Sequence, residues 1–230
     1  MSLNRSFRSS ARLSILSFVF LFTTLLLTAQ QSSQPTVLFT CDFPGSDPAH
    51  YGVSVSADGT SSYISDGKLS RDSDTPGDLA TTNFNLSHAT VSHIFDLAKA
   101  ADYFSGNLES KKKKIASTGD KNLSYTDGAR KTSANYNYSE NPSVQELTTI
   151  FQHLAASLEF GRRLDFDYHY QKLALDDELK RMEDAAIRGD LVELPATAPV
   201  LAKIMQDASV INASRARAQR LLAGIKPAGQ

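Results

Sequence analysis

Apolar residues alternate with small or polar residues in the part of the chain that follows residue 36, the pattern of strands with one buried face. Val53 and Val55 alternate in this way and lead to Asp58-Gly59, a dipeptide typical of a tight hairpin turn, because both central residues need φ > 0. A two-residue loop there pairs Val55 with Ser62 and Val53 with Ile64. The pattern therefore predicts a hairpin with its apolar residues on one face.

A second hairpin is predicted around Asp127-Gly128. One of its faces then carries apolar and aromatic residues, namely Leu123, Tyr125, Thr132, Ala134, Tyr136 and Tyr138. The opposite face carries polar residues, namely Asn122, Ser124, Lys131, Ser133, Asn135 and Asn137. Such a division predicts a sheet with one solvent-exposed face and one covered face.

Helical spacing of apolar residues predicts the elements that cover the sheet. A third strand over 79–86 is followed by Ser87, a good N-cap for a helix that reaches about Tyr103. Asn141-Pro142 begins another helix. Its apolar stripe consists of Val144, Leu147, Phe151, Leu154 and Leu158.

Past Gly161 the chain becomes helical and charged. A narrow apolar stripe runs through 164–182, and residues 199–224 form a further helix or a helical hairpin around 207–209. Residues 165–193 carry a net charge of −5 and residues 207–226 a net charge of +3, so these helices are expected to pack together. Alternatively, the apolar stripe over 164–182 could mediate self-association of the chain.

These patterns predict an α+β fold, in which an antiparallel hairpin sheet has one face covered by helices and is followed by a C-terminal helical extension. The α+β domain is expected over 37–160 and the helical extension over 161–230.

The first 30 residues have the features of a secretory signal peptide. Arg5, Arg8 and Arg12 precede a 15-residue apolar run, 13–27, which as a helix spans roughly 22 Å and is shorter than the ~30 Å hydrocarbon core. Cleavage is expected after Ala29 or Gln30, with 31–36 as a flexible spacer; an uncleaved single-helix anchor is the alternative. We therefore expect an exported protein, periplasmic or secreted, with no membrane span in the mature chain.

Composition and the absence of known motifs exclude several classes of functional site. The single cysteine, Cys41, excludes an internal disulfide framework and multi-thiolate metal sites, and fits an oxidising compartment. The formal net charge of −1 gives no reason to expect a nucleic-acid partner. The sequence contains no dinucleotide-binding, P-loop, nucleophile-elbow or HExxH motif, so no cofactor is expected.

A lysine-rich segment is the first candidate binding site. Lys111, Lys112, Lys113, Lys114 and Lys131 belong to a stretch, 109–131, with a net charge of +4 that could bind an anionic polymer. The alternative is a solvated loop, since lysines near a strand edge also discourage aggregation.

Asp165 and His169 are the candidate metal ligands, because they lie one helical turn apart. Two ligands make an incomplete site, and His50 or Asp47 would have to complete it. Asp165 could instead pair with His169 or with Arg162 on a solvated helix face.

Six stretches spread over most of the mature chain have a familiar sequence, namely Asp42–Pro48, Ile94–Lys99, Phe104–Lys114, Tyr136–Ser139, Leu158–Leu164 and Arg215–Leu222. These stretches resemble uncharacterised exported proteins of Acidobacteria-type soil bacteria. The resemblance implies an exported protein and transfers no catalytic residue.

The sequence as a whole leads us to expect a non-catalytic binding or assembly module of the cell envelope. Its partner would be an envelope protein or an anionic surface polymer. The alternative is a metal-dependent or hydrolytic enzyme of the periplasm built on Asp165 and His169.

Overall fold

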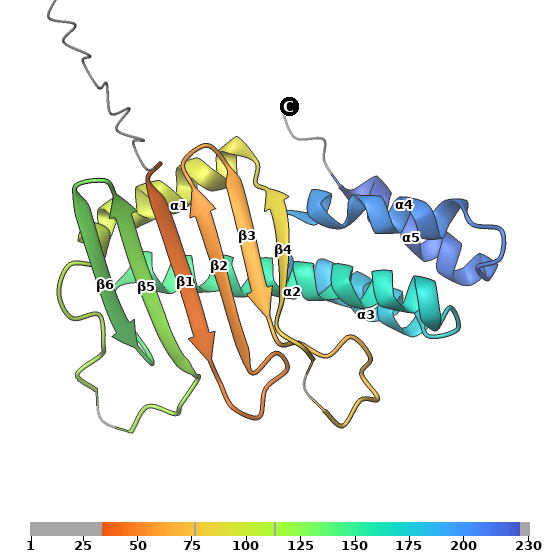
Figure 1. The fold of residues 1–230 in the computed structure, drawn as a ribbon, viewed down its shortest axis with the longest axis horizontal. Helices are drawn as coiled ribbons and strands as arrows, with labels where there is room; N and C mark the ends of the chain where they lie inside the picture. Colours follow the sequence, from red (N-terminus) through yellow and green to blue (C-terminus); the bar gives the residue numbers. More distant parts are fainter. Residues whose placement is uncertain (1–33, 76, 113, 226–230) are drawn as a thin grey trace, which may run out of the picture. The chain divides into compact units, whose positions relative to one another are not determined.

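The computed structural model describes residues 34–225, except 76 and 113. The expected signal peptide, the first residues of the expected spacer and Lys113 therefore lie outside the described residues. Within the described ranges the chain contains one six-stranded antiparallel sheet with the strand order β4-β3-β2-β1-β5-β6 (Figure 1). The strands are β1 (Thr36–Asp42), β2 (His50–Ser56), β3 (Thr60–Ser65), β4 (Ala80–Asn85), β5 (Asp120–Asp127) and β6 (Arg130–Tyr136).

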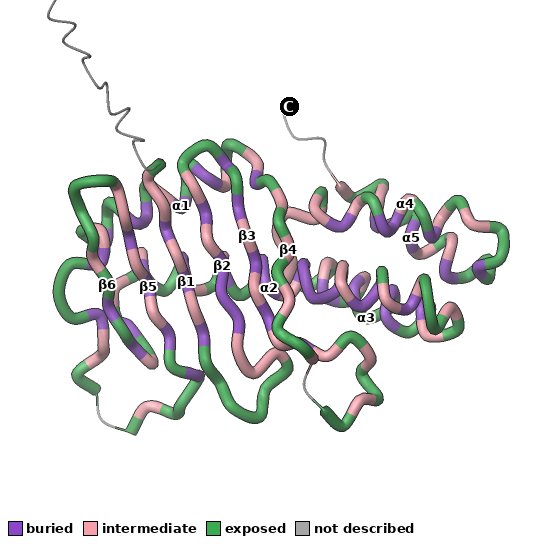
Figure 2. The backbone as a smooth tube through the Cα atoms, in the orientation of Figure 1, coloured by how far each residue is buried: buried purple, intermediate pink, exposed green. Residues whose placement is uncertain are grey.

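One face of this sheet is covered and the other is open, as predicted. Buried and partly exposed residues alternate along the strands, which Figure 2 shows as changes of colour along each strand. The covered face carries the large apolar residues Val37, Phe39, Val53, Val55, Tyr63 and Leu123. The open face carries mainly Ser, Thr and Asn, which suits contact with water.

The first hairpin has a register that differs by one residue from the predicted one. Val55 pairs with Ser61 and Val53 with Tyr63, so the predicted pairs of Val55 with Ser62 and of Val53 with Ile64 are wrong. The loop holds one residue more than expected, and Gly59 takes φ +90° in it. This shift places Tyr63 on the covered face instead of Ile64.

The second hairpin keeps the predicted faces. Asp127 pairs with Arg130, so the turn is Gly128-Ala129, one residue later than expected, and the register moves by two. An even shift leaves every side chain on its face. Tyr138 is the exception among the residues assigned to the covered face: it follows the end of β6 and is 36% exposed.

Helices cover the sheet and then continue past it. They are α1 (His88–Ala100), η1 (Asp102–Phe104), α2 (Pro142–Tyr170), α3 (Leu175–Arg188), η2 (Leu194–Thr197), α4 (Ala198–Gln206) and α5 (Asn212–Gly224). Ser87 caps α1 and Asn141 caps α2, as predicted. α1 and the first half of α2 lie behind the sheet, whereas the second half of α2 and α3–α5 extend beyond β4 (Figure 1). Of the helices that the structure describes, none is both long and apolar enough to cross a membrane.

The helical extension has its own apolar core. One cluster of buried residues ends along α2 at Leu158, and a second begins at Phe160. The helix itself is continuous across 160–161, so the division of the chain there stays a prediction. The 164–182 stripe is interrupted at 171–174, and its residues Leu164, Leu175, Leu179 and Met182 are buried within the chain.

Opposite charges join α5 to α3, as the charge pattern predicted. Arg217 Nη1 lies 2.7 Å from Glu183 Oε2 and Arg217 Nε 3.0 Å from Asp176 Oδ1. The extension is also tied to the sheet-covering part: Glu193 accepts a 2.6 Å hydrogen bond from Ser87 Oγ.

Cys41 lies at the end of β1 on the covered face and is 4% exposed. Burial raises the pKa of its thiol, which therefore stays protonated and unreactive in the folded chain.

Candidate functional site

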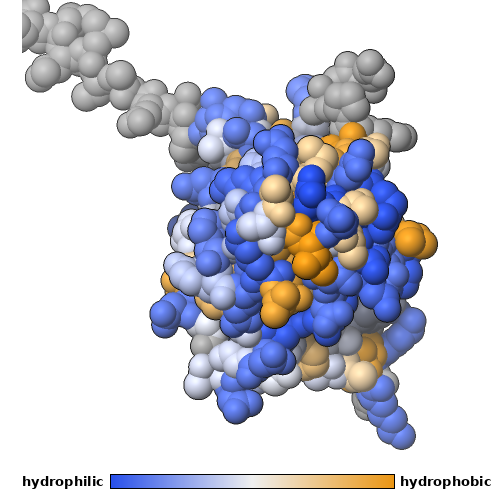
Figure 3. All heavy atoms as spheres, turned by 90° about the vertical axis from the view of Figure 1, so that its right-hand side faces the viewer, coloured by the Kyte–Doolittle hydropathy of each residue, from blue (hydrophilic) through white to orange (hydrophobic). Residues whose placement is uncertain are grey.

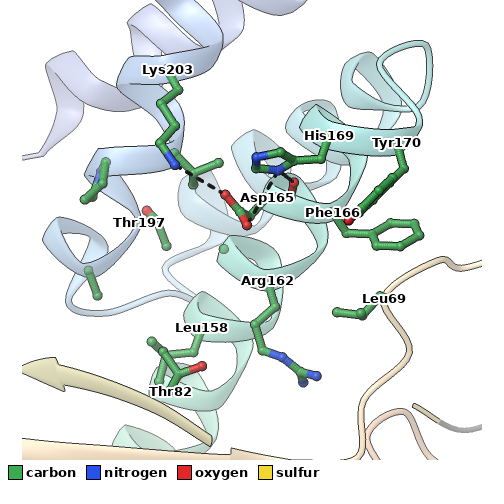
Figure 4. A pocket seen from close by; sticks show the side chains of 14 residues that line it. Leu69, Thr82, Leu158, Arg162, Asp165, Phe166, His169, Tyr170, Thr197 and Lys203 are labelled. Carbon is green, nitrogen blue, oxygen red and sulfur yellow. Dashed lines mark hydrogen bonds and ion pairs between the residues drawn. The ribbon is translucent and has the colours of Figure 1, made fainter. Parts of the chain in front are cut away.

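A groove of about 630 Å³ lies where the helices pass beyond the edge strand β4 (Figure 4). Its walls come from β4, the segment that precedes β4, α2, and η2 with α4. The lining residues are Leu69, Thr82, Leu158, Gly161, Arg162, Asp165, Phe166, His169, Tyr170, Ala196, Thr197, Pro199, Val200 and Lys203. The groove exists because the sheet stops at β4 while the covering layer of helices continues.

Apolar side chains form much of the groove wall. Phe166 and Tyr170, one helical turn apart on α2, have ring centroids 5.1 Å from each other. Leu158 is buried at the base on the same helix, and Leu69 approaches from the segment before β4 (Figure 4). Concave apolar walls with a few placed polar groups are typical of binding sites.

The two predicted metal ligands lie together in this groove, and a lysine joins them. His169 Nδ1 lies 2.7 Å from the carbonyl oxygen of Asp165 and 3.8 Å from its Oδ2. Lys203 Nζ, from α4, lies 3.6 Å from Asp165 Oδ1 (Figure 4). Asp165 therefore pairs with His169 and Lys203 and not with Arg162.

Neither residue considered for completing the metal site belongs to the groove. His50 Nδ1 lies 2.5 Å from Asp42 Oδ1, and Asp47 accepts a hydrogen bond from the amide of Lys68. Across the described residues there is no group of three His, Cys, Asp or Glu side chains arranged to hold a metal ion. The Lys203 ammonium beside Asp165 also competes electrostatically with a cation there.

Arg162, at the edge of the groove, belongs to a buried polar cluster that sequence reasoning missed. Its Nη1 donates to Glu159 Oε1 at 2.6 Å, and Tyr63 and Ser65 donate to the same oxygen at 2.9 and 2.6 Å. Glu159 is 2% exposed. A Cβ on Gly67 would lie 2.4 Å from Glu159 Oε2, so any side chain at this position would have to displace the buried carboxylate.

The cluster continues through Glu178 on α3. Its carboxylate accepts hydrogen bonds at 2.6 Å from Arg163 Nε and at 2.6 Å from Arg71 Nε. Burial alone would raise the pKa of Glu178, but the hydrogen bonds and charges of the two arginines outweigh burial and hold this pKa below its ordinary value. These buried pairs fix α3 and the segment before β4 against α2, and so fix the groove walls.

One signal in the sequence could have indicated this cluster. Glu159, Arg162 and Arg163 are spaced three and four residues apart, and they interrupt an apolar stretch of α2 between Leu158 and Leu164. Charged residues at helical spacing inside an apolar stripe are typical of buried ion pairs.

The lysines of the predicted binding site do not all lie together in the structure. Lys112 Nζ pairs with Glu140 at 2.6 Å, and the loop that carries it is attached at Tyr138 through a hydrogen bond from the amide of Ser110. Lys131 lies toward the other end of β6, about 20 Å from Asn137 along the strand. Lys111, Lys112 and Lys114 therefore share one loop, and Lys131 lies apart from them.

Apolar residues also gather at the outer end of the helical extension. Figure 3 shows hydrophobic residues within a hydrophilic surface on this side of the molecule. Leu173, between α2 and α3, and Ile211, before α5, are exposed, and Lys172 joins their two loops through a 2.7 Å ion pair with Asp207.

Comparisons with known proteins assign no relative to this site: no protein-family model matches the chain, and no curated protein matches it.

Proposed function

We propose that the chain is an exported, non-catalytic binding module of the bacterial cell envelope that holds a partner in the groove between β4, α2 and α4. The observation that carries this proposal is the groove itself, with its volume of about 630 Å³, its apolar walls and its polar groups at the rim. Export is proposed from the N-terminal charge and apolar pattern of the sequence.

The groove is suited to binding because its walls are held by buried interactions before a partner arrives. Glu159 and Glu178 connect the helix that forms the base to β3, to α3 and to the segment before β4. A preorganised site loses less conformational entropy on binding than a mobile one.

An envelope protein suits this groove better than an anionic polymer does. The groove's own charges are largely balanced, since Asp165 faces Lys203 and Arg162 faces Glu159. The lysine loop offers less free positive charge than its sequence suggests, because Lys112 is paired with Glu140. An apolar contact therefore dominates what the groove can recognise.

Site-specific photo-cross-linking in intact cells of the producing bacterium tests the proposal. A photoreactive residue replaces Leu69, which lines the groove, and the control replaces Ile187, which is 84% exposed on α3 and lies outside the groove. We expect a discrete cross-linked partner from position 69 and none from position 187. Phe166→Ala, which removes an apolar wall, should reduce the yield.

Equal cross-linking from both positions, or no product from position 69, would contradict the proposal. A product whose yield is unaffected by Phe166→Ala would place the partner elsewhere on this surface.

A further inference from the structure

The strand β4 is an open edge of the sheet. In the described part of the chain it pairs on one side only, with β3. Its sequence, ATTNFN, contains no charge and no proline. Charges, prolines and covering loops are the usual devices that keep an edge strand from pairing with another chain, and β4 has neither of the first two.

The opposite edge of the sheet, strand β6, has features that discourage pairing with another chain. β6 begins with Arg130-Lys131, and the loop before β5 is attached to the two residues that follow the strand: Ser110 N donates to Tyr138 O at 2.8 Å, and Thr118 N donates to Asn137 Oδ1 at 2.7 Å. The two edges of one sheet thus differ in how they are protected.

The backbone register identifies the amides that β4 presents outward. Leu86 N donates to Gly59 O at 3.0 Å, so these two residues form a hydrogen-bonded pair just beyond the strand. Hydrogen-bonded and non-hydrogen-bonded pairs alternate in an antiparallel ladder. Phe84 and Thr82 therefore bond to β3, while Thr81, Asn83 and Asn85 direct their N–H and C=O groups away from the sheet.

The groove lies beneath the position that the next strand would take. Thr82 faces the groove from the covered side of β4, together with Leu158 and Phe166 of α2. A strand placed about 4.8 Å beyond β4 would direct every second side chain to that side, into the groove. The outward amides of β4 and the apolar groove thus form one surface.

We propose that this surface binds an extended peptide segment of the partner protein by β-strand addition. The segment becomes a seventh strand beside β4 and places apolar side chains, at alternate positions, in the groove. This inference rests on the proposed function and names the form of the partner. An extended polypeptide is the occupant because its backbone can form hydrogen bonds with the outward N–H and C=O groups of β4. Its side chains in the groove are expected to be uncharged, because the charges of the groove are already balanced.

A second copy of the chain fits this edge less well. An antiparallel pairing of β4 with β4 of another copy would bring both helical layers to the same side of the joined sheet. The helices already extend past β4 on that side (Figure 1). A free segment has no such layer and meets no such obstacle.

Proline substitution at position 83 separates strand addition from other modes of binding. Asn83→Pro removes an outward N–H without removing a hydrogen bond to β3, and Asn83→Ala keeps that N–H. The probe is a display library of linear peptides of about ten residues, selected against the full chain. We expect enriched peptides with apolar residues at alternate positions, equal affinity for Asn83→Ala, and an affinity for Asn83→Pro lower by about tenfold or more.

Hydrogen exchange of the unsubstituted chain gives a second test, which does not depend on whether the proline variant folds. A selected peptide should slow exchange at the amides of Thr81, Asn83 and Asn85. The amides of Thr82 and Phe84, already bonded to β3, should change little.

The remaining outcomes overturn the inference. Peptides that bind Asn83→Pro as tightly as Asn83→Ala, yet lose affinity with Phe166→Ala, would leave the proposed groove function standing and refute strand addition. Peptides insensitive to both substitutions, or no enrichment, would refute both. A dimer of the chain that Asn83→Pro dissociates would assign the edge to a second copy.

Discussion

Asp167 is a buried acid that lacks a partner of its own. Its residue is 6% exposed on α2, and no hydrogen bond or ion pair reaches its carboxyl from the described residues. Burial, together with the charge of Glu178, raises the pKa of Asp167 to about 6, against the smaller opposing effects of Arg163 and Arg71. Near neutral pH the folded chain therefore carries a carboxylate in an unfavourable place.

Asp167→Asn should stabilise the fold in a pH-dependent manner. The carboxyl ionises near pH 3.9 in the unfolded chain and near 6 in the folded chain, so rising pH between these values favours unfolding. We expect the variant to be more stable by about 1–3 kcal/mol at pH 7.5, with the gain vanishing below about pH 4. Urea unfolding of the variant and the unsubstituted chain, at pH 7.5 and at about pH 4, measures this difference in the free energy of unfolding.

The exposed Asp184 provides the control for this prediction. Asp184→Asn should change the free energy of unfolding little, and equally at both pH values. A destabilised Asp167→Asn at pH 7.5 would show that the carboxylate makes a favourable interaction there.

Sequence reasoning at the residue scale reached the local part of the site. The four-residue spacing of Asp165 and His169 correctly placed them on one helix face. Lys203 joins them from a helix whose position depends on tertiary packing, which spacing does not reveal. For the same reason the pairing of Glu178 with Arg71, 107 residues away, could not be predicted.

At the scale of elements, the two hairpins show how much turn chemistry determines. Both Asp-Gly dipeptides mark turns, but the first loop holds one residue more than the two expected, and the second loop, which has two residues, lies one residue later than expected. In the first hairpin, a register shift of one residue places Tyr63 on the covered face, where Ile64 was expected. In the second hairpin, a register shift of two residues leaves each side chain on the expected face. Helix starts were predicted better, because the caps Ser87 and Asn141 act on neighbouring amides.

Gly59→Ala tests the first turn. Gly59 has φ +90°, and an added Cβ would lie 3.2 Å from the carbonyl oxygen of Leu86, so we expect a loss of about 1–2 kcal/mol of stability. Gly224→Ala is the matched control, because it lies in α5 with no atom within 4 Å of its Cβ and should leave stability unchanged or slightly raise it. Thermal unfolding compares them; equal melting temperatures would contradict this account of the turn.

At the scale of the molecule, the α+β class followed from hydrophobic patterning, but the groove did not. The groove depends on β4 being the outer strand of the order β4-β3-β2-β1-β5-β6, and on α2 continuing past it. Local patterns predict which residues form strands and which face is covered. They leave open the order of strands that are distant in sequence, such as β1 and β5.

The proposed export leads to a prediction for the whole chain. In the cells that produce it, the accumulated protein should begin at Gln30 or Gln31, because the N-terminal pattern predicts removal of a signal peptide after Ala29 or Gln30. Intact-mass measurement of the purified protein checks it. A mass that retains the first 30 residues would indicate an uncleaved anchor instead.

The buried Cys41 gives the unaltered chain a chemical reporter of its own motions. A bulky thiol reagent should modify it mainly during transient openings around it, since the folded chain leaves the residue only 4% exposed and keeps the sulfur protonated. Because the chain has one cysteine, each labelling event reports on one location, at the end of the central strand β1. The rate of labelling in native buffer therefore yields the free energy of opening there, without a probe having to be engineered into the chain.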